Sequence, residues 1–472
     1  MSGYSRITEV ILKNFKNVGY GKISKLEFSG DEPSLLGIYG QNGSGKTALV
    51  EACLLLKYLM SGFKIPDSFV QTISADKEYS ELEFSFVLSI NEIDSPVYID
   101  YSFKLDRQIK MPQDGQESGY QVRVFDEIVK VSCSSIVGFS SKTKLIDTIK
   151  GDSYCPNSLL KDLSKGSKKA LDNLKKIRFL AQNTSLSSIF NSMTAQQFNA
   201  SSNSFFKNVI FSLRDFGLSK LFVITTLEQN LLDFGLLPLN FSVDEEKSEK
   251  NIEDKLDGHS SVGKLILPLK SNIQIPVAHV RVIQKAITSL NGVLTKVVPG
   301  LMVELQEKGR LTNSKGQEVC NVVVLSNRNG IKLPLETESN GVKKLISILQ
   351  LIITVYNRSD ITVVIDELDA GIFEYLLGEL LAVIAEGGKG QLFFTSHNLR
   401  PLELLDKKYL CFTSVNPKNR YVRVRGVKTN NNLRDFYYRD IQLGLQHDAL
   451  YDSTDRSQIA FYLYEAGNPS AR

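Results

Sequence analysis

The chain has 472 residues, of which 42% are hydrophobic and 23% are charged, a composition typical of a soluble globular protein with room for two or three domains. The net charge of +4 excludes a strong overall field for nucleic acids, although it allows a local basic face. The five cysteines are scattered without CxxC spacing, which argues against a zinc site or disulfide framework and favours a reducing compartment. No apolar stretch is long enough to cross a bilayer, and the first residues lack the apolar core of a signal peptide. We therefore expect a cytoplasmic protein without membrane contact.

The N-terminal part predicts strands, a loop and a helix. Residues 35–39 form a short apolar run that ends at Gly40, as a buried strand would, and the largely apolar stretch from residue 46 predicts a helix. Hydrophobic and polar residues then alternate in three segments, which predicts an antiparallel sheet. The predicted strands are 7–12 and 22–28, around a loop whose glycines indicate a turn, and the alternating segments 82–88, 97–105 and 121–131.

The middle of the chain changes character near residue 155. Residues 158–182 predict a lysine-rich helical stretch, and helical or mixed patterns continue to residue 233. Residues 242–261 are polar and charged with almost no large apolar side chain, which indicates a loop or linker. The other predicted elements are a helix at 276–294 and strands at 302–306 and 319–325.

The C-terminal part returns to an α/β pattern. Residues 361–365 form a β-branched run, which predicts a buried parallel strand. The other predicted elements are helices at 343–356 and 372–386 and strands at 391–395, 409–414 and 420–427.

The sequence GQNGSGKT at residues 40–47 matches the phosphate-binding pattern GxxxxGK[ST] between a predicted strand and a predicted helix. Glycines in such a loop let backbone N–H groups turn toward phosphate oxygens, and the helix N-terminus adds partial positive charge. Lys46 is expected to reach the β- and γ-phosphates of ATP, and Thr47 to hold Mg²⁺. The alternative is a chance match in a Gly/Ser-rich loop, against which the strand–loop–helix context argues. The candidate nucleotide-binding residues are Gly40, Asn42, Gly43, Ser44, Gly45, Lys46 and Thr47.

Two acidic residues end the β-branched run, in the sequence ITVVIDELD at 361–369. At the end of a buried strand beside the nucleotide, Asp366 would help to hold Mg²⁺, and Glu367 would orient or deprotonate the attacking water. Taken alone, the pair fits an acidic turn that caps the next helix equally well. The presence of the phosphate-binding loop favours the catalytic interpretation.

An apolar strand carries His397 at its end, in the sequence LFFTSHN at 392–398. A lone histidine is usually structural. Its order relative to Asp366 and Glu367 places it where a group on a neighbouring strand can contact the γ-phosphate. We therefore treat His397 as a candidate catalytic residue.

Ser339 and Gly341 immediately precede a predicted apolar helix, in the sequence ETESNGVKKL at 336–345. A hydroxyl at a helix N-terminus makes an anion site. Serine and asparagine are also favoured helix caps, and the pattern alone favours an ordinary cap.

In this order, the four elements resemble the ABC-class ATPases of the SMC, RecF and OLD branch. The resemblance implies an α/β fold of the P-loop NTPase class and ABC type, with a mixed or antiparallel N-terminal sheet and a compact, largely helical insertion. It implies that Ser339, Asn340 and Gly341 form the signature loop in a divergent SxG form, and that His397 is the switch histidine. Further correspondences are Lys16 of the sequence NFK, near the nucleotide, and a D-loop at Leu368, Asp369 and Ala370; the Q-loop glutamine stays open among Gln71, Gln108 and Gln121.

The C-terminal sequences IDELDAGIFEYLLGELL and TSHNLRPLELL more narrowly resemble AAA-type ATP-binding proteins of bacterial defence islands, such as the ATPase components of the anti-phage systems PARIS and Septu. The resemblance implies that residues 40–47 of one copy and Ser339 of another enclose each ATP, and that hydrolysis opens this interface. It implies an ATPase with slow turnover, in a homodimer or larger homo-oligomer, that acts as a sensor or scaffold and controls a separate effector, a nuclease or toxin. The alternative is a RecF-like DNA-repair ATPase that acts directly on DNA.

We expect four parts: the N-terminal half of the ATPase core at 1–150, a mainly helical insertion at 151–300, the C-terminal half of the core at 301–430, and a tail at 431–472 for assembly or partner contact. The insertion lacks heptads, which excludes a long coiled coil. Its basic residues fit two explanations, a solvated helix face or a contact surface for DNA or an acidic protein. These residues are Lys161, Lys165, Lys168, Lys169, Lys175, Lys176 and Arg178.

Overall fold

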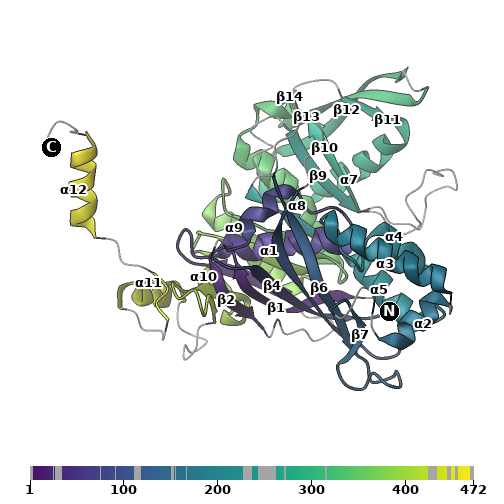
Figure 1. Ribbon diagram of the computed structural model, residues 1–472. Helices are drawn as coiled ribbons and strands as arrows, with labels where there is room; N and C mark the ends of the chain where they lie inside the picture. The colour runs from purple at the N-terminus through teal and green to yellow at the C-terminus, as the bar shows by residue number, and fades with distance from the viewer. Residues whose placement is uncertain are drawn as a thin grey trace.

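The described chain forms a layered α/β body, and the C-terminal helix stands apart from it (Figure 1). The expected linker at 242–261 lies outside the described residues except for Ser242. The computed structural model describes residues 4–24, 26, 34–74, 76–90, 92–110, 119–149, 154, 156–165, 167–226, 236–242, 262–269, 273–313, 316–423, 433–443, 448–451 and 455–467.

A six-stranded sheet forms the centre of the molecule. Its strands β3 (Ser34–Tyr39), β15 (Thr362–Ile365) and β16 (Gln391–Thr395) are buried at every position, as their continuous apolar runs predict. Five of the six strands run parallel, so the loops that follow β3, β15 and β16 meet at one edge of the sheet. The sheet order is β18-β17-β3-β16-β15-β8, with β8 at Leu221–Ile224, β17 at Leu410–Thr413 and β18 at Tyr421–Val422.

A second sheet of six strands is antiparallel throughout, which confirms the sheet predicted from the alternating segments. The helix α1 (Lys46–Ser61) shares one hydrophobic core with this sheet and with one face of the parallel sheet. The helix that follows the phosphate-binding loop is therefore fixed between two sheets. The strand order is β2-β1-β4-β5-β6-β7, with β1 at Ser5–Phe15, β2 at Val18–Ile23, β4 at Tyr79–Leu88, β5 at Val97–Ile109, β6 at Tyr120–Ser132 and β7 at Thr143–Asp147.

The sequence predicts that glycines form the turn between β1 and β2, but other residues form it. Lys16 and Asn17 make the turn, whereas Gly19 and Gly21 lie within β2. A Cβ atom at Gly21 would lie 2.6 Å from the ring of Tyr421. The glycine therefore lets the β17–β18 hairpin approach β2 closely. Such close approach explains glycine within a strand, where no turn is needed.

Helix α8 (Asn340–Asn357) joins the parallel sheet to an outer lobe. Leu345 and Ile348 pack into the core that contains β15 and β16, whereas Ile346 and Leu349 pack into the core of the lobe, against α7 (Val277–Val297). Apolar side chains on both sides explain why α8 is buried along most of its length. The lobe's strands are β9 (Leu236–Ser242), β10 (Val262–Pro268), β11 (Ile273–Pro276), β12 (Leu301–Thr312), β13 (Glu318–Arg328) and β14 (Ile331–Pro334), and the 3₁₀ turn η5 (Leu335–Thr337) leads to α8.

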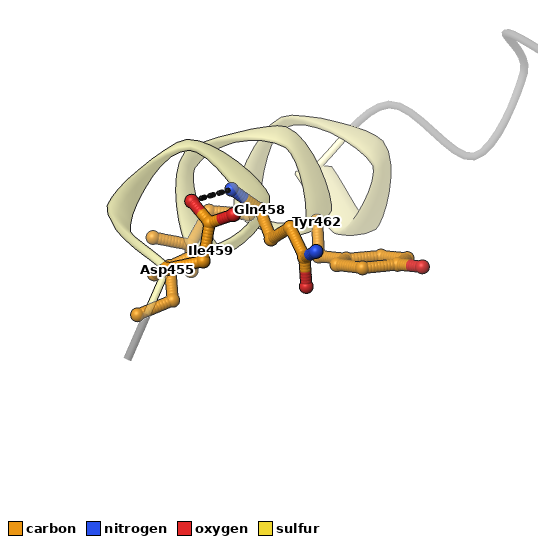
Figure 2. Close-up of a pocket in the computed structure, with 5 residues that line it drawn as sticks. Asp455, Gln458, Ile459 and Tyr462 are labelled. Carbon is orange, nitrogen blue, oxygen red and sulfur yellow. Dashed lines mark hydrogen bonds between the residues drawn. The ribbon is translucent and has the colours of Figure 1, made fainter. Parts of the chain in front are cut away.

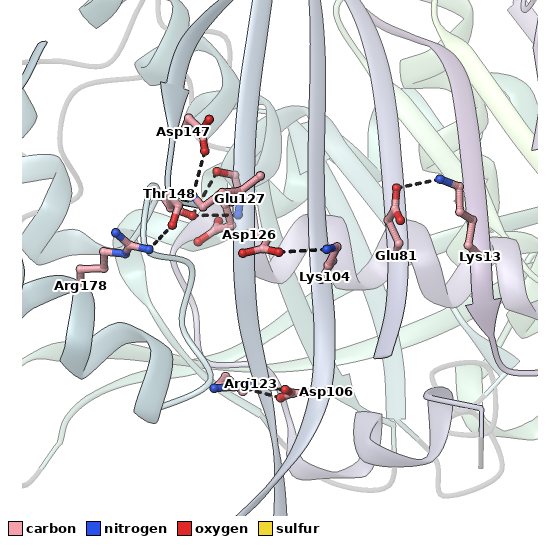
Figure 3. A network of polar contacts seen from close by, with 11 residues as sticks. Lys13, Glu81, Lys104, Asp106, Arg123, Asp126, Glu127, Asp147, Thr148 and Arg178 are labelled. Carbon is pink, nitrogen blue, oxygen red and sulfur yellow. Dashed lines mark hydrogen bonds and ion pairs between the residues drawn. The ribbon is translucent and has the colours of Figure 1, made fainter. Parts of the chain in front are cut away.

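The lysine-rich stretch predicted to be helical forms two helices, α2 (Asn157–Ser164) and α3 (Lys168–Asn183). Arg178, which the sequence groups with the exposed lysines, is buried, and its guanidinium donates to the carbonyl oxygen of Thr148 (Figure 3). The prediction that Arg178 belongs to an exposed basic surface is therefore wrong. The insertion continues with α4 (Ser192–Asn199), α5 (Ser204–Asp215) and the π-helical turn η2 (Phe216–Lys220), which leads directly into β8 of the parallel sheet.

The helices of the C-terminal part differ in how they pack. In α11 (Leu433–Leu443), the ring of Tyr437 stacks on Phe412 of β17 with 5.2 Å between centroids, so this helix belongs to the body. In α12 (Arg456–Gly467), nearly every residue is exposed. The hollow beside α12 is bounded by that helix and its cap alone, through Asp455, Gln458, Ile459, Tyr462 and Leu463 (Figure 2), so it is not a site for the chemistry above. The remaining helices are η1 (Asp67–Thr72), α9 (Glu374–Gly387), α10 (Pro401–Leu404) and η6 (Lys407–Tyr409).

Candidate nucleotide-binding site

The loop at 40–47 has the backbone that a phosphate cradle requires. Gly43 and Gly45 have φ angles of 75° and 97°, in the left-handed region that favours glycine. A Cβ atom at Gly40 would lie 1.8 Å from the hydroxyl of Thr413, so only glycine fits there. The loop therefore leaves β3, turns through these glycines and enters α1 at Lys46, as the sequence predicts.

Residues distant in the sequence hold the loop in place. Asn17, from the β1–β2 turn, donates its side-chain amide to the carbonyl oxygen of Gly43, and the hydroxyl of Tyr421 donates to the carbonyl oxygen of Gly45 at 2.9 Å. The hydroxyls of Ser44 and Thr413 are hydrogen-bonded to each other. The cradle is thus supported by both sheets, although the phosphate-binding motif names none of these partners.

Lys46 is directed into this loop. Its Nζ atom donates to the carbonyl oxygens of Gly40 and Gln41, at 2.8 and 2.9 Å, and the side chain is 7% exposed. Burial lowers the pKa of the Lys46 amino group, and the carboxylates of Asp366 and Glu367 oppose this shift. Strands β3 and β15 both pair in parallel with β16, so Lys46 and the acidic pair lie at the same edge of the sheet, although some 320 residues separate them in the sequence.

Asp366 follows directly on β15, and its carboxylate is buried and hydrogen-bonded. Thr395 at the end of β16 donates to Oδ1 at 2.6 Å, and Thr226 after β8 donates to Oδ2 at 3.1 Å. The backbone N–H of Asp366 donates to the carbonyl oxygen of Ile224. Hydroxyls from both neighbouring strands therefore fix the carboxylate at the edge of the sheet where the phosphate loop lies.

Glu367 has a φ angle of 45°, a left-handed conformation that costs a non-glycine residue about 1–3 kcal/mol. Its backbone N–H donates to the hydroxyl of Thr395 at 2.7 Å. Its carbonyl oxygen accepts from the amino group of Lys344 at 2.7 Å and from the N–H of Ala370 at 3.1 Å. The surrounding side chains and the following turn thus hold this conformation against its intrinsic cost.

The segment after the acidic pair and the end of the strand that carries His397 are joined through one carboxylate. Oδ2 of Asp369 accepts from the backbone N–H groups of His397 and Asn398, at 3.1 and 3.0 Å. The His397 side chain is exposed beside Asp369. A pocket here is lined by Asp369, Ile372, Glu374, His397, Asn398, Leu399 and Arg434.

Ser339 caps α8, because its hydroxyl accepts from the N–H of Val342 at 3.3 Å, and its side chain is exposed. Gly341 lies against the turn that follows the acidic pair: a Cβ atom there would be 2.1 Å from the carbonyl oxygen of Gly371. The structure therefore confirms the helix cap. It also shows that the turn at 339–341 is packed against the loop after the acidic pair.

Lys16 and the three candidate glutamines have defined partners or positions. The amino group of Lys16 pairs with Glu51 of α1 at 2.7 Å. Gln108 and Gln121 both hydrogen-bond to Asn183 of α3, whereas Gln71 is exposed in η1. The backbone N–H of Lys16 donates to the carbonyl oxygen of Thr72, the residue that follows Gln71 in that same helix.

Six residues around the site are not among the predicted site residues: Asn17, Thr226, Lys344, Thr395, Thr413 and Tyr421. The threonines lie at or just after the ends of β8, β16 and β17. The sequence does not show which strands pair, so it does not show that these hydroxyls reach the site. Lys344 had a visible signal, since a lysine pair at 343–344 begins an otherwise apolar helix. A buried lysine needs a polar partner. The lysine in an apolar helix therefore predicts that a partner exists, but the sequence does not identify that partner as Glu367.

The site fits ATP and Mg²⁺ by its chemistry. The cradle offers backbone N–H groups and a buried amine for phosphate oxygens, and Thr47 with Asp366 offers the hydroxyl and carboxylate oxygens that Mg²⁺ prefers. Magnesium would supply charge neutralisation between the phosphates. Fold and site together define a P-loop NTPase of the ABC type, with a parallel core sheet, an antiparallel sheet and α1 between them.

The chain belongs to the AAA family described as "AAA domain, putative AbiEii toxin, Type IV TA system", whose model matches residues 35–403. This range includes the phosphate-binding loop, the helix cap at Ser339, the acidic pair and His397. No curated protein matches the sequence.

Several solved structures are distantly similar to the chain. The Smc head bound to the C-winged helix domain of ScpA is 14% identical, with 89% of this chain and 98% of that chain covered and a TM-score of 0.40. The SMC head from Thermotoga maritima is 16% identical, with 89% and 100% covered and a TM-score of 0.36. RecF with ATP, from the RecFOR pathway, is 13% identical, with 83% and 93% covered and a TM-score of 0.33. The fold assignment rests on the strand order and the family match rather than on these likenesses.

Within the described part of the chain, no helix combines the length and the hydropathy needed to cross a membrane.

Proposed function

We propose that this chain binds and slowly hydrolyses ATP with Mg²⁺ at a site shared between two copies, and that it acts as a nucleotide-gated sensor or scaffold that controls a separate effector. One observation carries the proposal: Lys46, Asp366 and Glu367 converge at the carboxyl edge of one parallel sheet. At this edge Lys46 would bind phosphate, Asp366 would bind the metal, and Glu367 would contact the attacking water.

The roles of the residues follow from their positions. Lys46 and the loop N–H groups bind the β- and γ-phosphates, and Thr47 and Asp366 hold the metal. Glu367 lies one residue beyond Asp366 and takes the role of orienting or deprotonating the water, while His397 contacts the γ-phosphate from the next strand. Lys16 approaches the nucleotide once its pairing with Glu51 is exchanged for a phosphate.

The second half of the site is assigned to another copy. Ser339 is exposed at the start of α8 and Gly341 lies against the turn that follows the acidic pair of its own chain, so Ser339, Gly341 and Asp369 belong to one surface. A helix N-terminus with an exposed capping hydroxyl suits the γ-phosphate of a nucleotide held by a neighbouring copy. ATP would then stabilise a homodimer, and hydrolysis would release it.

Sedimentation of the protein with Mg²⁺ and ATP tests this part of the proposal. The Glu367→Gln variant should sediment as a dimer with ATP and as a smaller species without it. A variant that stays the same size under both conditions contradicts nucleotide-gated assembly.

We further propose that the chain acts in bacterial anti-phage defence. The family description, which names a toxin of a type IV toxin–antitoxin system, supports this role. We assign the acidic pair and His397 to nucleotide chemistry, and the nuclease or toxin activity to a separate effector. Co-expression with the adjacent gene, followed by purification and phage challenge, tests this role. The absence of both a complex and a phage phenotype would contradict it.

The alternative is an ATPase that acts directly on DNA. The observation that favours it is the exposed basic surface of α2 and α3, which carries Lys161, Lys165, Lys168, Lys169 and Lys176 without Arg178. Filter binding of duplex DNA at moderate salt, with and without ATP, separates the two functions. ATP-dependent affinity supports the repair function, and its absence supports the effector-controlling function.

A further inference from the structure

Lys344 is a buried lysine close to the proposed catalytic base. It lies in the second turn of α8, is 5% exposed, and its Nζ atom donates to the carbonyl oxygen of Glu367 at 2.7 Å. A buried amine is costly unless it is paired, so this contact has a purpose beyond packing an otherwise apolar helix. The neighbouring Lys343 is equally buried, but its Nζ atom contacts the carbonyl oxygen of Glu336 at 3.3 Å, away from the acidic pair.

The contact acts on a residue whose backbone is unfavourable in isolation. The left-handed φ of Glu367 determines where its Cα–Cβ bond points, and therefore where the carboxylate can reach. Thr395 fixes the N–H on one side of this residue, and Lys344 fixes the carbonyl oxygen on the other. Residues held in such conformations persist only where their surroundings determine them, and they occur preferentially at active sites.

We propose that Lys344 is a positioning residue for ATP hydrolysis, which holds the Glu367 backbone so that its carboxylate faces the attacking water. Lys344 itself does not contact the reacting atoms. The inference rests on the proposed function, since it assumes that Glu367 is the base.

The role can be tested by Lys344→Met, which keeps the length and volume of the side chain and removes the donor. The kcat for ATP should fall about 10- to 100-fold, because a small displacement of a catalytic group has effects of this size, while the affinity for ATP stays within about 3-fold. Lys343→Met is the matched control, because it removes a buried amine from the adjacent position without the contact to Glu367. It should retain kcat.

A double variant separates positioning from a general structural role. If Lys344 acts through Glu367, then adding Lys344→Met to Glu367→Gln should slow single-turnover hydrolysis no further. Equal kcat in Lys344→Met and the native chain, a parallel loss of ATP affinity, or an additional loss in the double variant would each overturn the inference. Should Lys344→Met fail to fold, Lys344→Gln, whose amide nitrogen is one bond short of the amine, is judged by the same measurements.

These outcomes are distinguishable from failure of the proposed function. A native chain that does not hydrolyse ATP overturns the proposed function, and the role of Lys344 with it. A native chain that hydrolyses ATP through Lys46 and Glu367, and is unaffected by Lys344→Met, overturns only the inference about Lys344.

Discussion

The hydroxyl of Thr395 donates to the carboxylate of Asp366 at 2.6 Å, across the parallel pairing of β15 and β16. The same oxygen accepts the backbone N–H of Glu367. One side chain thus orients both members of the acidic pair, and it comes from the strand that leads to His397.

Removing this hydroxyl should impair metal-dependent turnover. Thr395→Val keeps the side-chain shape and removes both hydrogen bonds, and residues that orient metal ligands typically contribute 10- to 100-fold. We expect kcat to fall by about this factor and the Mg²⁺ concentration for half-maximal activity to rise. Thr354→Val is the control, since Thr354 is also buried and its hydroxyl donates to the carbonyl oxygen of Gln350 within α8. An unaltered Mg²⁺ dependence in Thr395→Val would count against the metal role of Asp366.

Lys46→Ala should abolish ATP binding. The buried amine is a charged donor directed into the loop, and such a charge-assisted contact contributes enough for a loss of about 100-fold or more. Equilibrium binding of a fluorescent ATP analogue measures this. Lys57→Ala, at a lysine near the far end of the same helix that lies over the ring of Phe222, should bind the analogue normally.

Glu367→Gln should keep ATP binding and lose turnover. The amide cannot accept a proton from water, so kcat should fall about 10²- to 10⁴-fold, and the ATP-bound dimer should accumulate. Phosphate release and sedimentation measure the two effects. Glu386→Gln, at an exposed position near the end of α9, serves as the control. Normal hydrolysis by Glu367→Gln would show that the base has been assigned to the wrong residue.

Gly341→Ala should destabilise the protein, although alanine normally stabilises a helix. The new methyl group would lie 2.1 Å from the carbonyl oxygen of Gly371, so α8 and the turn at Gly371 must separate, at a cost of about 1–3 kcal/mol. Gly292→Ala in α7 has no atom within 4 Å and should stabilise by about 0.5–1 kcal/mol. Thermal unfolding of both variants should therefore give shifts of opposite sign. A rise in Tm for both variants would contradict the close packing of Gly341 against Gly371.

The buried carboxyl of Glu127 predicts a pH dependence of stability. It accepts hydrogen bonds from Tyr101 at 2.7 Å, Ser187 at 2.6 Å and the N–H of Ser188 at 2.5 Å, and Figure 3 shows it beside Thr148. Burial raises the pKa of Glu127 in spite of these donors. The folded state therefore holds the proton more tightly than the unfolded state, so the contribution of Glu127 to stability is fully present below the unfolded pKa of about 4.3 and is lost as the pH rises through the folded pKa.

Glu127→Gln removes this titration. The stability of the variant relative to the native chain should improve as the pH rises from about 4, with a slope of up to about 1.4 kcal/mol per pH unit. Urea unfolding at several pH values measures the difference. A difference that is constant with pH, or that changes in the opposite direction, contradicts the raised pKa.

The sequence predicts those parts of the site that are contiguous in the chain. Residues 40–47 and the pair Asp366 and Glu367 each carry their own strand, turn and chemistry, so local pattern is sufficient. The hydroxyls of Thr226 and Thr395 reach Asp366 only because β8 and β16 pair with β15, and pairing between strands separated by long insertions is not a local property. For the same reason β8 was not foreseen as a strand.

Other differences arise from ambiguous residue types. Glycine occurs both in turns and where two segments approach closely, so the sequence indicates a turn at Gly21, although this glycine makes room for Tyr421. Arginine serves both surfaces and buried hydrogen bonds, so Arg178 was grouped with the exposed lysines although it binds Thr148. In both cases the partner lies far away in the sequence, and only the folded arrangement distinguishes the alternatives.

Mixing two inactive variants tests most directly whether each ATP is enclosed by two copies. Lys46→Ala disables the phosphate loop and Ser339→Arg obstructs the surface assigned to the opposing copy, so each variant alone should lack ATPase activity. A shared site predicts that an equimolar mixture regains about one quarter of the native rate per chain, because half of the dimers are mixed and each of these has one intact site. A mixture that stays inactive while forming mixed dimers, or a Ser339→Arg variant with native activity on its own, would contradict the account.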